Sequence, residues 1–559
     1  MSIIDNIRES IKDRRQDKLE NDMNDIVAKK TNLNFNPYNI SKILYLENDE
    51  NFTERLIENH TWYTANLSAL QEYYRHHKQI KSRYYRDDFN FFWSKVKPTH
   101  RKVHTKLPSL LTEKMVDLII GNGYSLEASV VSFNENGEEI EEDNLRELLN
   151  QKLNNMEVEN NFYDLLSSSI SSESWSGGVA WKIVLDKEFS NYPIIQKADQ
   201  RNFHLITKYG RVIGVSFKEY YLENKQNYIF YETYTTDENG DAMILSKLYI
   251  VDKNKQEREV PLTELKQTKD LEPELILKGL KGVLGFSKKN KTTNKEFSNS
   301  PYGESDYAGL YSHFDALDEV ASSMIDDIRK NKIKTYIPET FLPVDKYGNR
   351  TSLDEFENNF IQLKGHDPAD EGSDKIEFSN PGSRIIEYME NWKIELMQVI
   401  NGFGLSPLTI GATGLESLNA SDASQIQREK VSLRTRKTKV NLWQEFLNTL
   451  VPQMINSYLY LNSDDKEEIG DLIEIAKNPD KYKIKVDFKF EEYLIRPIEE
   501  RLASFSLARN PQNLSISLEE MVRQVYRGEK TEDEIREEID RLKMELNLTI
   551  DDADRDLLE

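Results

Sequence analysis

Three pairs of adjacent aspartates are the residues best suited to metal-dependent chemistry in this sequence. They occupy residues 87–88, 326–327 and 464–465, and carboxylates of this kind can hold Mg²⁺ for phosphoryl chemistry. The pairs are scattered over predicted helix surfaces, where such charges are ordinarily solvated. We therefore predict no metal site, and keep a metal-dependent DNA-processing enzyme as an alternative function.

Other signatures of catalysis are weak or missing. The sequence has no cysteine, which excludes thiol nucleophiles and cysteine-ligated metals, and it has no P-loop signature. The segment ESWSGG lacks the G-x-S-x-G spacing of a nucleophile elbow, so we interpret it as a buried turn before a strand at 178–185. His76 and His77 are adjacent on a predicted helix and face different directions. We predict a protein that is not an enzyme and has no cofactor.

A basic segment, residues 427–440, stands out because the whole chain carries a net charge of −23. Glu429 is the only acidic residue within it. Its cations are Arg428, Lys430, Arg434, Arg436, Lys437 and Lys439. Two interpretations stay open: contact with DNA phosphates, or salt bridges to acidic side chains of neighbouring subunits.

The basic segment lies in a region of three predicted helices with two different interruptions. Apolar residues recur at three- and four-residue spacing in each helix. The expected order is a helix, an insert rich in turn residues, a second helix, a short polar loop and a third helix: 301–334, 335–382, 383–410, 411–421 and 422 to about 461. Pro452 is expected to kink the third helix. In the first helix, acidic residues from Asp306 onward precede basic residues such as Lys330, an order that suits the helix dipole.

The segments on either side of this region suggest an α+β fold. Residues 1–170 are predicted to be mainly helical. Residues 178–260 form short runs rich in Val, Ile and aromatic residues, with turn candidates at YGRVIG and DENGDA, and predict an antiparallel sheet of five or more strands. Residues 262–300 are interpreted as loops with a little strand. The alternating segment KYKIKVDFKFEEYL is expected to return to that sheet, and a helical tail follows from 498.

Length and charge limit the class of protein. A chain of 559 residues is too long for one ordinary core and predicts two to four domains. The N-terminus has no apolar core of a signal peptide, and no stretch approaches the roughly 20 apolar residues of a membrane span. The acidic surface repels nucleic acid at long range unless basic residues are segregated locally.

The order of these segments resembles the portal proteins of tailed bacteriophages, specifically the siphophage type from Gram-positive hosts. VHTKLPSLLTEKMVDLIIGNGYSLE resembles the start of the portal wing, and NSPYGESDYAGLYSHFDALDEVASSMIDDIRK resembles the first stem helix. LSPLTIGATGLESLNASDASQIQREK resembles the tunnel-loop region, and LEEMVRQVYRGEKTEDEIREEIDRLKMEL resembles the crown. The likeness covers most of the chain from about residue 60 and lies in the order and spacing of segments.

The resemblance implies a division of the chain into portal parts. The wing would be residues 1–300, with a helical N-terminal part and the sheet at 178–260. The stem helices would be 301–334 and 383–410, separated by a small α/β clip. The remaining parts would be the clip at 335–382, the tunnel loop at 411–421, a long kinked helix with a wing return strand at 422–497, and a crown at 498–559.

The resemblance also implies partners and sites. Such subunits assemble into a closed head-to-tail ring of about twelve copies at one capsid vertex of the virion, after assembly in the host cytoplasm. The terminase large subunit packages double-stranded DNA through the ring without sequence specificity, and the DNA later leaves into the tail. Other implied partners are a head-completion adaptor and the major capsid and scaffolding proteins, with no membrane. The implied channel residues are Lys330, Lys332, Lys334, Thr413, Leu415, Glu416 and Asn419. The implied clip docking residues are Tyr347, Asn349, Arg350, Asp367 and Asp370. A non-enzymatic helical adaptor built on 301–461 is a further alternative.

Overall fold

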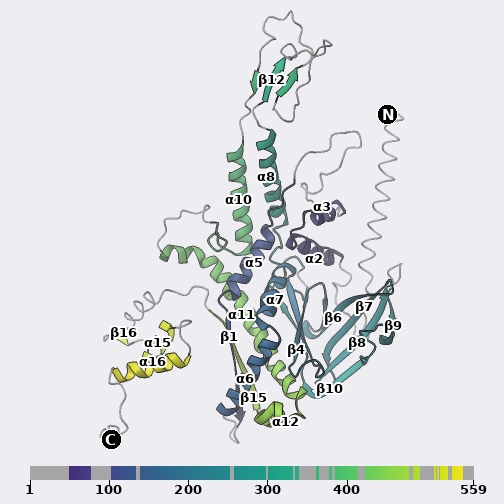
Figure 1. Ribbon diagram of the computed structural model, residues 1–559, viewed down its shortest axis with the longest axis vertical. Coiled ribbons are helices and arrows are strands. Elements are labelled where there is room, and N and C mark those ends of the chain that lie inside the picture. The colour runs from purple at the N-terminus through teal and green to yellow at the C-terminus, as the bar shows by residue number, and fades with distance from the viewer. Residues whose placement is uncertain are drawn as a thin grey trace, which may run out of the picture. The chain divides into compact units, whose positions relative to one another are not determined.

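The protein is an α+β chain with several separate sheets (Figure 1). The computed structural model describes residues 50–76, 102–133, 139–251, 257–297, 300–330, 334–338, 360–363, 377–379, 384–412, 422–477, 482–491, 509–510, 513–514, 517–526 and 532–545. The chain divides into two compact units. The first holds residues up to Leu118 and Glu127–Asp487, and the second holds Ile119–Leu126 and Phe488–Glu559.

A six-stranded antiparallel sheet forms the largest β element of the first unit. Its strand order is β10-β8-β7-β6-β5, with β9 paired to β8. The strands are β5 (Phe203–Lys208), β6 (Arg211–Glu223), β7 (Gln226–Thr236), β8 (Asp241–Val251), β9 (Glu257–Val260) and β10 (Glu274–Lys281). Asn224 and Lys225 both have positive φ, which gives the tight two-residue turn that matches strand twist between β6 and β7. The predicted antiparallel sheet and the turn at Tyr209 and Gly210 are confirmed.

A smaller sheet packs between the large sheet and the helices. It has the order β11-β3-β4, with β3 (Gly178–Val184), β4 (Ile194–Asp199) and β11 (Gly285–Lys289). Trp181 of β3 is fully buried and contacts Phe162, Trp443 and Phe446 edge-on or tilted. A side chain on Gly285 would meet Tyr234 of the large sheet at 2.8 Å, so the two sheets approach closely there.

The described residues of the first unit also form helices. They are α2 (Glu50–Tyr63), α3 (Leu67–His76), α5 (Leu107–Ile120), α6 (Asp143–Glu159), α7 (Phe162–Ser176), α8 (Tyr311–Lys330), α10 (Ile385–Phe403), α11 (Asp422–Leu461), α12 (Lys466–Ile469) and α13 (Ile473–Lys477). Between α8 and α10 the chain forms a three-stranded sheet of β13 (Phe360–Leu363), β12 (Lys334–Pro338) and β14 (Glu377–Ser379). Pro452 lies inside α11, and the kink there stays a prediction.

Three expectations from the sequence are corrected. The first helix begins at Tyr311, not at 301, because the preceding residues bind other segments of the chain. Residues 262–300 contain two full strands, β10 and β11. β15 (Tyr482–Phe490) joins β1 (Tyr124–Phe133) and β2 (Glu139–Glu141), and not the six-stranded sheet. Alternation reveals a strand but not its partner, and β1 lies in a region expected to be helical.

The second unit has its own small core. Its helices α15 (Leu518–Tyr526) and α16 (Glu532–Glu545) bury Val522, Ile535 and Ile539 against each other. Two short strands, β16 (Arg509–Asn510) and β17 (Asn513–Leu514), pair antiparallel. The expectation of a helical tail is confirmed for these two helices.

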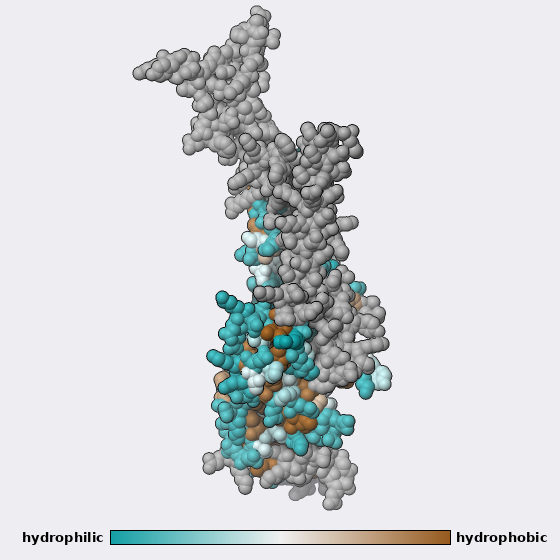
Figure 2. Space-filling model, turned by 90° about the vertical axis from the view of Figure 1, so that its right-hand side faces the viewer, coloured by the Kyte–Doolittle hydropathy of each residue, from teal (hydrophilic) through white to brown (hydrophobic). Residues whose placement is uncertain are grey.

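The surface of the first unit mixes apolar and polar side chains. Figure 2 shows brown hydrophobic patches set among teal hydrophilic surface. Among the described residues, Leu222 is 74% exposed and Tyr220 is 62% exposed on β6. None of the described helices combines the length and apolar character that crossing a membrane requires.

Candidate functional site

The candidate site is the antiparallel pair of helices α8 and α10. His313 near the start of α8 lies 2.7 Å from Glu395 in the second half of α10 (Nδ1 to Oε2). Asp327 near the end of α8 accepts a hydrogen bond from the backbone N–H of Arg384, just before α10. Gly402 faces Leu310, so close that an added Cβ would lie 2.4 Å from the Leu310 Cδ2 atom. The pairings run in opposite directions along the two helices and fix their antiparallel alignment.

The apolar stripes of this pair are buried at only one end. Phe314 and Leu317 of α8, and Val399 of α10, are at most 1% exposed. Toward the start of α10, Ile386 is 74% and Met389 is 48% exposed. An apolar stripe that continues past the core is the kind of surface that another protein chain covers.

The segment of residues 102–106 forms hydrogen bonds along one side of α8. The backbone N–H of Val103 donates to the Ser322 hydroxyl at 2.9 Å. Asp318 accepts hydrogen bonds from the backbone N–H and the hydroxyl of Thr105, both at 2.8 Å. The Nδ1 atom of His104 lies 2.6 Å from the other carboxylate oxygen of Asp318. Asp318 is fully buried, so these contacts replace the water that its carboxylate loses.

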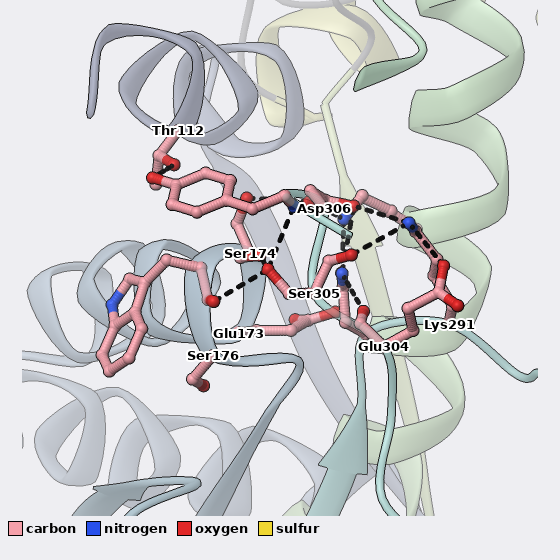
Figure 3. Close-up of polar contacts among 12 residues, drawn as sticks. Thr112, Glu173, Ser174, Ser176, Lys291, Glu304, Ser305 and Asp306 are labelled. Atoms are coloured by element: carbon pink, nitrogen blue, oxygen red, sulfur yellow. Dashed lines mark hydrogen bonds and ion pairs between the residues drawn. The ribbon is translucent and has the colours of Figure 1, made fainter. Parts of the chain in front are cut away.

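A buried polar cluster lies just before α8, and we call it the polar junction (Figure 3). Asp306 is at its centre, 3% exposed. The junction consists of Ser174, Asn290, Lys291, Glu304, Ser305, Asp306 and Lys439. These residues come from the end of α7, from the segment after β11, from the segment before α8, and from α11.

Asp306 is held by donors from three of these segments. Lys439 of α11 lies 2.7 Å away and the Ser174 hydroxyl donates at 2.7 Å, both to Oδ2. The side-chain amide of Asn290 donates to Oδ1 at 3.0 Å, and Lys439 also binds the Asn290 amide oxygen. Burial opposes ionisation of Asp306, but Lys439 and Lys291 hold the pKa of its carboxyl below the usual value. The carboxylate is therefore charged, and its charge is balanced by the buried Lys439 and the partly exposed Lys291.

Close backbone contacts reinforce the junction. Gly177 ends α7 in the left-handed conformation, with φ +97°, and its N–H donates to the Glu173 carbonyl. An added Cβ on Gly303 would lie 2.2 Å from the Gly177 carbonyl oxygen and 2.7 Å from the Asn290 nitrogen. The Ser305 hydroxyl donates to the Trp175 carbonyl at 2.8 Å. Only glycine fits at 303, so the chain before α8 lies against the end of α7.

A second buried ion pair lies beside the junction. Lys288 of β11 is 2.5 Å from Glu173 of α7, and its ammonium lies 4.4 Å from the centre of the Trp443 ring of α11. Burial raises the pKa of Glu173 and lowers the pKa of Lys288 to about 8. Together with Lys439, this pair ties α11 to α7 and to β11.

The structure divides the predicted basic segment of α11. Lys439 is 6% exposed and serves the junction, and the Arg436 Nε–H donates to the Leu118 carbonyl at 2.8 Å. This corrects the prediction that these two residues contact DNA or a neighbouring subunit, because their side chains bind other residues of the same subunit. Lys430, Arg434 and Lys437 are exposed. Arg428 lies in α11, and its side chain is outside the described part.

Most of the other predicted site residues lie outside the described residues. This holds for Lys332, Thr413, Leu415, Glu416, Asn419, Tyr347, Asn349, Arg350, Asp367 and Asp370. Lys330 is the last residue of α8 and Lys334 is the first residue of β12.

The acidic pairs do not form a metal site in the described part of the chain. There, no group of three or more His, Asp or Glu side chains is placed to hold a metal ion. Asp327 accepts from the backbone of Arg384, and Asp465 accepts from the backbone N–H of Glu468. Residues 87–88 are outside the described part.

The polar junction itself was missed by the sequence reasoning. The sequence pattern places Asp306 among the acidic residues of the first helix that suit the helix dipole, and Lys439 in the basic segment. The signal that could have indicated it is the pair of small-residue segments SWSGG and YGESD, which suit close backbone contact. The prediction that ESWSGG is buried is confirmed, because Glu173, Ser174, Trp175 and Ser176 are at most 3% exposed. The predicted turn is corrected, since these four residues are the end of helix α7.

Comparison with known proteins adds no family assignment. No protein-family model matches the sequence, and no curated protein matches it either.

Proposed function

We propose that the chain is the subunit of a ring-shaped portal, a channel at one capsid vertex through which double-stranded DNA is packaged and later ejected. The observation that carries the proposal is the α8/α10 pair with a small sheet inserted between its helices. After α10 the chain continues through residues 413–421 into the 40-residue helix α11. This is the order of stem, clip, stem, loop and long helix that the resemblance to portal proteins implies.

The exposed apolar stripe of α10 supports assembly. Ile386 is 74% and Met389 is 48% exposed on one chain. A closed ring of copies, each covering the stem of the next, would remove this surface from water at about 25 cal/mol per Å² of apolar area.

The rigid anchoring of the stem supports a mechanical role. α8 is fixed at its start by the polar junction and along its side by residues 102–106. A channel subunit must hold its stem in position while DNA moves past it. The terminase motor and the head-completion adaptor are proposed to dock on the part of the chain between α8 and α10.

The proposal is tested by the mass of the purified full-length protein in solution. We expect a single large species of about twelve subunits. A strict monomer at high concentration contradicts the proposal. Deleting residues 335–382 separates portal from adaptor: a portal subunit keeps forming rings and loses terminase docking, whereas a helical adaptor has no ring to keep. Divalent-ion-dependent DNA cleavage that disappears with Asp326→Asn and Asp327→Asn would instead indicate an enzyme.

A further inference from the structure

Among the described side chains of α11, the exposed cations lie on one face of the helix. Successive residues in an α-helix are turned by about 100°, so positions 430, 434 and 437 fall within about 60° of each other. Lys430, Arg434 and Lys437 are all exposed. Arg436 and Lys439, which bind inside the subunit, lie on the opposite side. We call the three exposed residues the basic face.

The basic face has no acidic partner within the described residues. No ion pair or side-chain hydrogen bond joins Lys430, Arg434 or Lys437 to any described residue. No acidic residue occurs between Lys430 and Glu445 in the sequence. Burial raises the pKa of Glu429, the acidic residue nearest in sequence. In a chain of net charge −23, the face is a local positive surface.

The composition of the face favours a nucleic acid over a protein partner. The neighbouring exposed residues on the same side are polar, Thr438 and Asn441, with Val431 as the apolar exception at 50% exposure. The cores of protein interfaces are depleted of lysine and enriched in apolar side chains, whereas phosphate contacts use Lys, Arg, Thr and Asn. α10 offers the opposite surface, with exposed Ile386, Met389 and Ile394.

We propose that the basic face of α11 binds the phosphates of double-stranded DNA, an inference that rests on the proposed channel function. From Lys430 to Lys437 the helix rises about 10 Å, the axial length of about three phosphates of one strand. The contact reads no bases, because these side chains meet only the backbone. The affinity of each subunit for DNA is modest, since the acidic remainder of the chain repels DNA at long range.

The test measures binding of the full-length protein to a fluorescent duplex of about 40 base pairs at about 50 and 200 mM salt. The variant is Lys430→Gln, Arg434→Gln, Lys437→Gln. The matched control removes three exposed cations elsewhere: Lys225→Gln, Lys266→Gln, Lys278→Gln. We expect the α11 variant to bind about tenfold more weakly at low salt. We also expect the slope of log affinity against log salt to become shallower by up to about 2.7. The control is expected to change affinity less than about twofold.

The outcomes separate this inference from the proposed function, because the mass of each protein is measured in parallel. Unchanged DNA binding by the α11 variant, an equal loss in the control, or no binding by the unsubstituted protein overturns the inference. A variant that loses its rings overturns it too, and assigns the face to a second copy of the chain. If the unsubstituted protein forms no ring, the proposed function fails, whatever the DNA result.

Discussion

The two sides of α11 carry the same kind of side chain in opposite settings. On one side Lys439 is buried and paired with Asp306, and on the other Lys430, Arg434 and Lys437 are exposed to water. Removing the partner of a buried cation leaves an uncompensated charge inside the protein. Removing the partner of an exposed cation changes stability by almost nothing. The cations of one helix therefore divide into those that hold the subunit together and those available to an outside partner.

The largest expected effect comes from breaking the polar junction. Asp306→Asn and Lys439→Met should each lower the free energy of unfolding by about 3–5 kcal/mol. The first leaves Lys439 buried without this carboxylate, and the second leaves Asp306 buried with only the partly exposed Lys291 nearby. The measurement is denaturant unfolding of the full-length protein. Lys437→Met, two residues away on the exposed side, is the matched control and should change stability by less than about 0.5 kcal/mol. Equal effects at 437 and 439 would remove the distinction between the two sides.

Substitutions in the contact between α8 and residues 102–106 should have the next largest effect on stability. Asp318→Asn weakens the contacts with Thr105 and His104. A hydrogen bond to a charged group contributes about 1.5–3 kcal/mol to the free energy of unfolding, so the loss should be of that size. The thermal transition of this variant is compared with that of Glu319→Gln, which changes an exposed neighbour on the same helix. Identical transitions for both variants would mean that residues 102–106 do not stabilise α8.

Glycine 303 tests the backbone contact directly. Gly303→Ala forces a methyl group into backbone atoms of Gly177 and Asn290, and should cost about 1–3 kcal/mol. Gly402→Ala also meets a neighbour, but that neighbour is the tip of the Leu310 side chain, which can turn away. We expect the Gly402 variant to be clearly milder in the same unfolding experiment. The reverse order would show that the chain around 303 can move.

A smaller effect concerns pH. The folded-state pKa of Asp306 lies below its ordinary value of 3.8, so in the window below pH 3.8 the unfolded state binds the proton first. The stability that Asp306 contributes is complete above pH 3.8 and is lost as pH falls through the folded-state value. The difference in stability between the unsubstituted protein and Asp306→Asn should therefore shrink below pH 3.8. A difference that stays constant down to the lowest measurable pH would indicate that folding does not lower the pKa of Asp306.

The sequence predicted the elements better than the contacts between them. Alternating and helical spacing located β5 to β8, α8, α10 and α11, because each pattern is local. The same patterns left the start of α8 wrong by ten residues, since Ser305 and Asp306 are positioned by Trp175, Ser174 and Lys439, which are remote in sequence. β15 was found but assigned to the wrong sheet for the same reason.

The positions of charged residues in the fold were the hardest feature to predict from the sequence. Asp306 and Lys439 look like surface residues because charged side chains are rarely fully buried. Their burial depends on each other, and on Asn290 and Ser174, so no single segment reveals it. Within the basic segment, only packing shows which members face outward.

The central claim is that copies of this chain form a ring around a channel for DNA. Electron microscopy of the purified full-length protein tests it most directly. We predict closed rings of one size, viewed end-on with an axial opening wide enough for a duplex. Isolated particles of single chains, or open filaments without closure, would contradict the account.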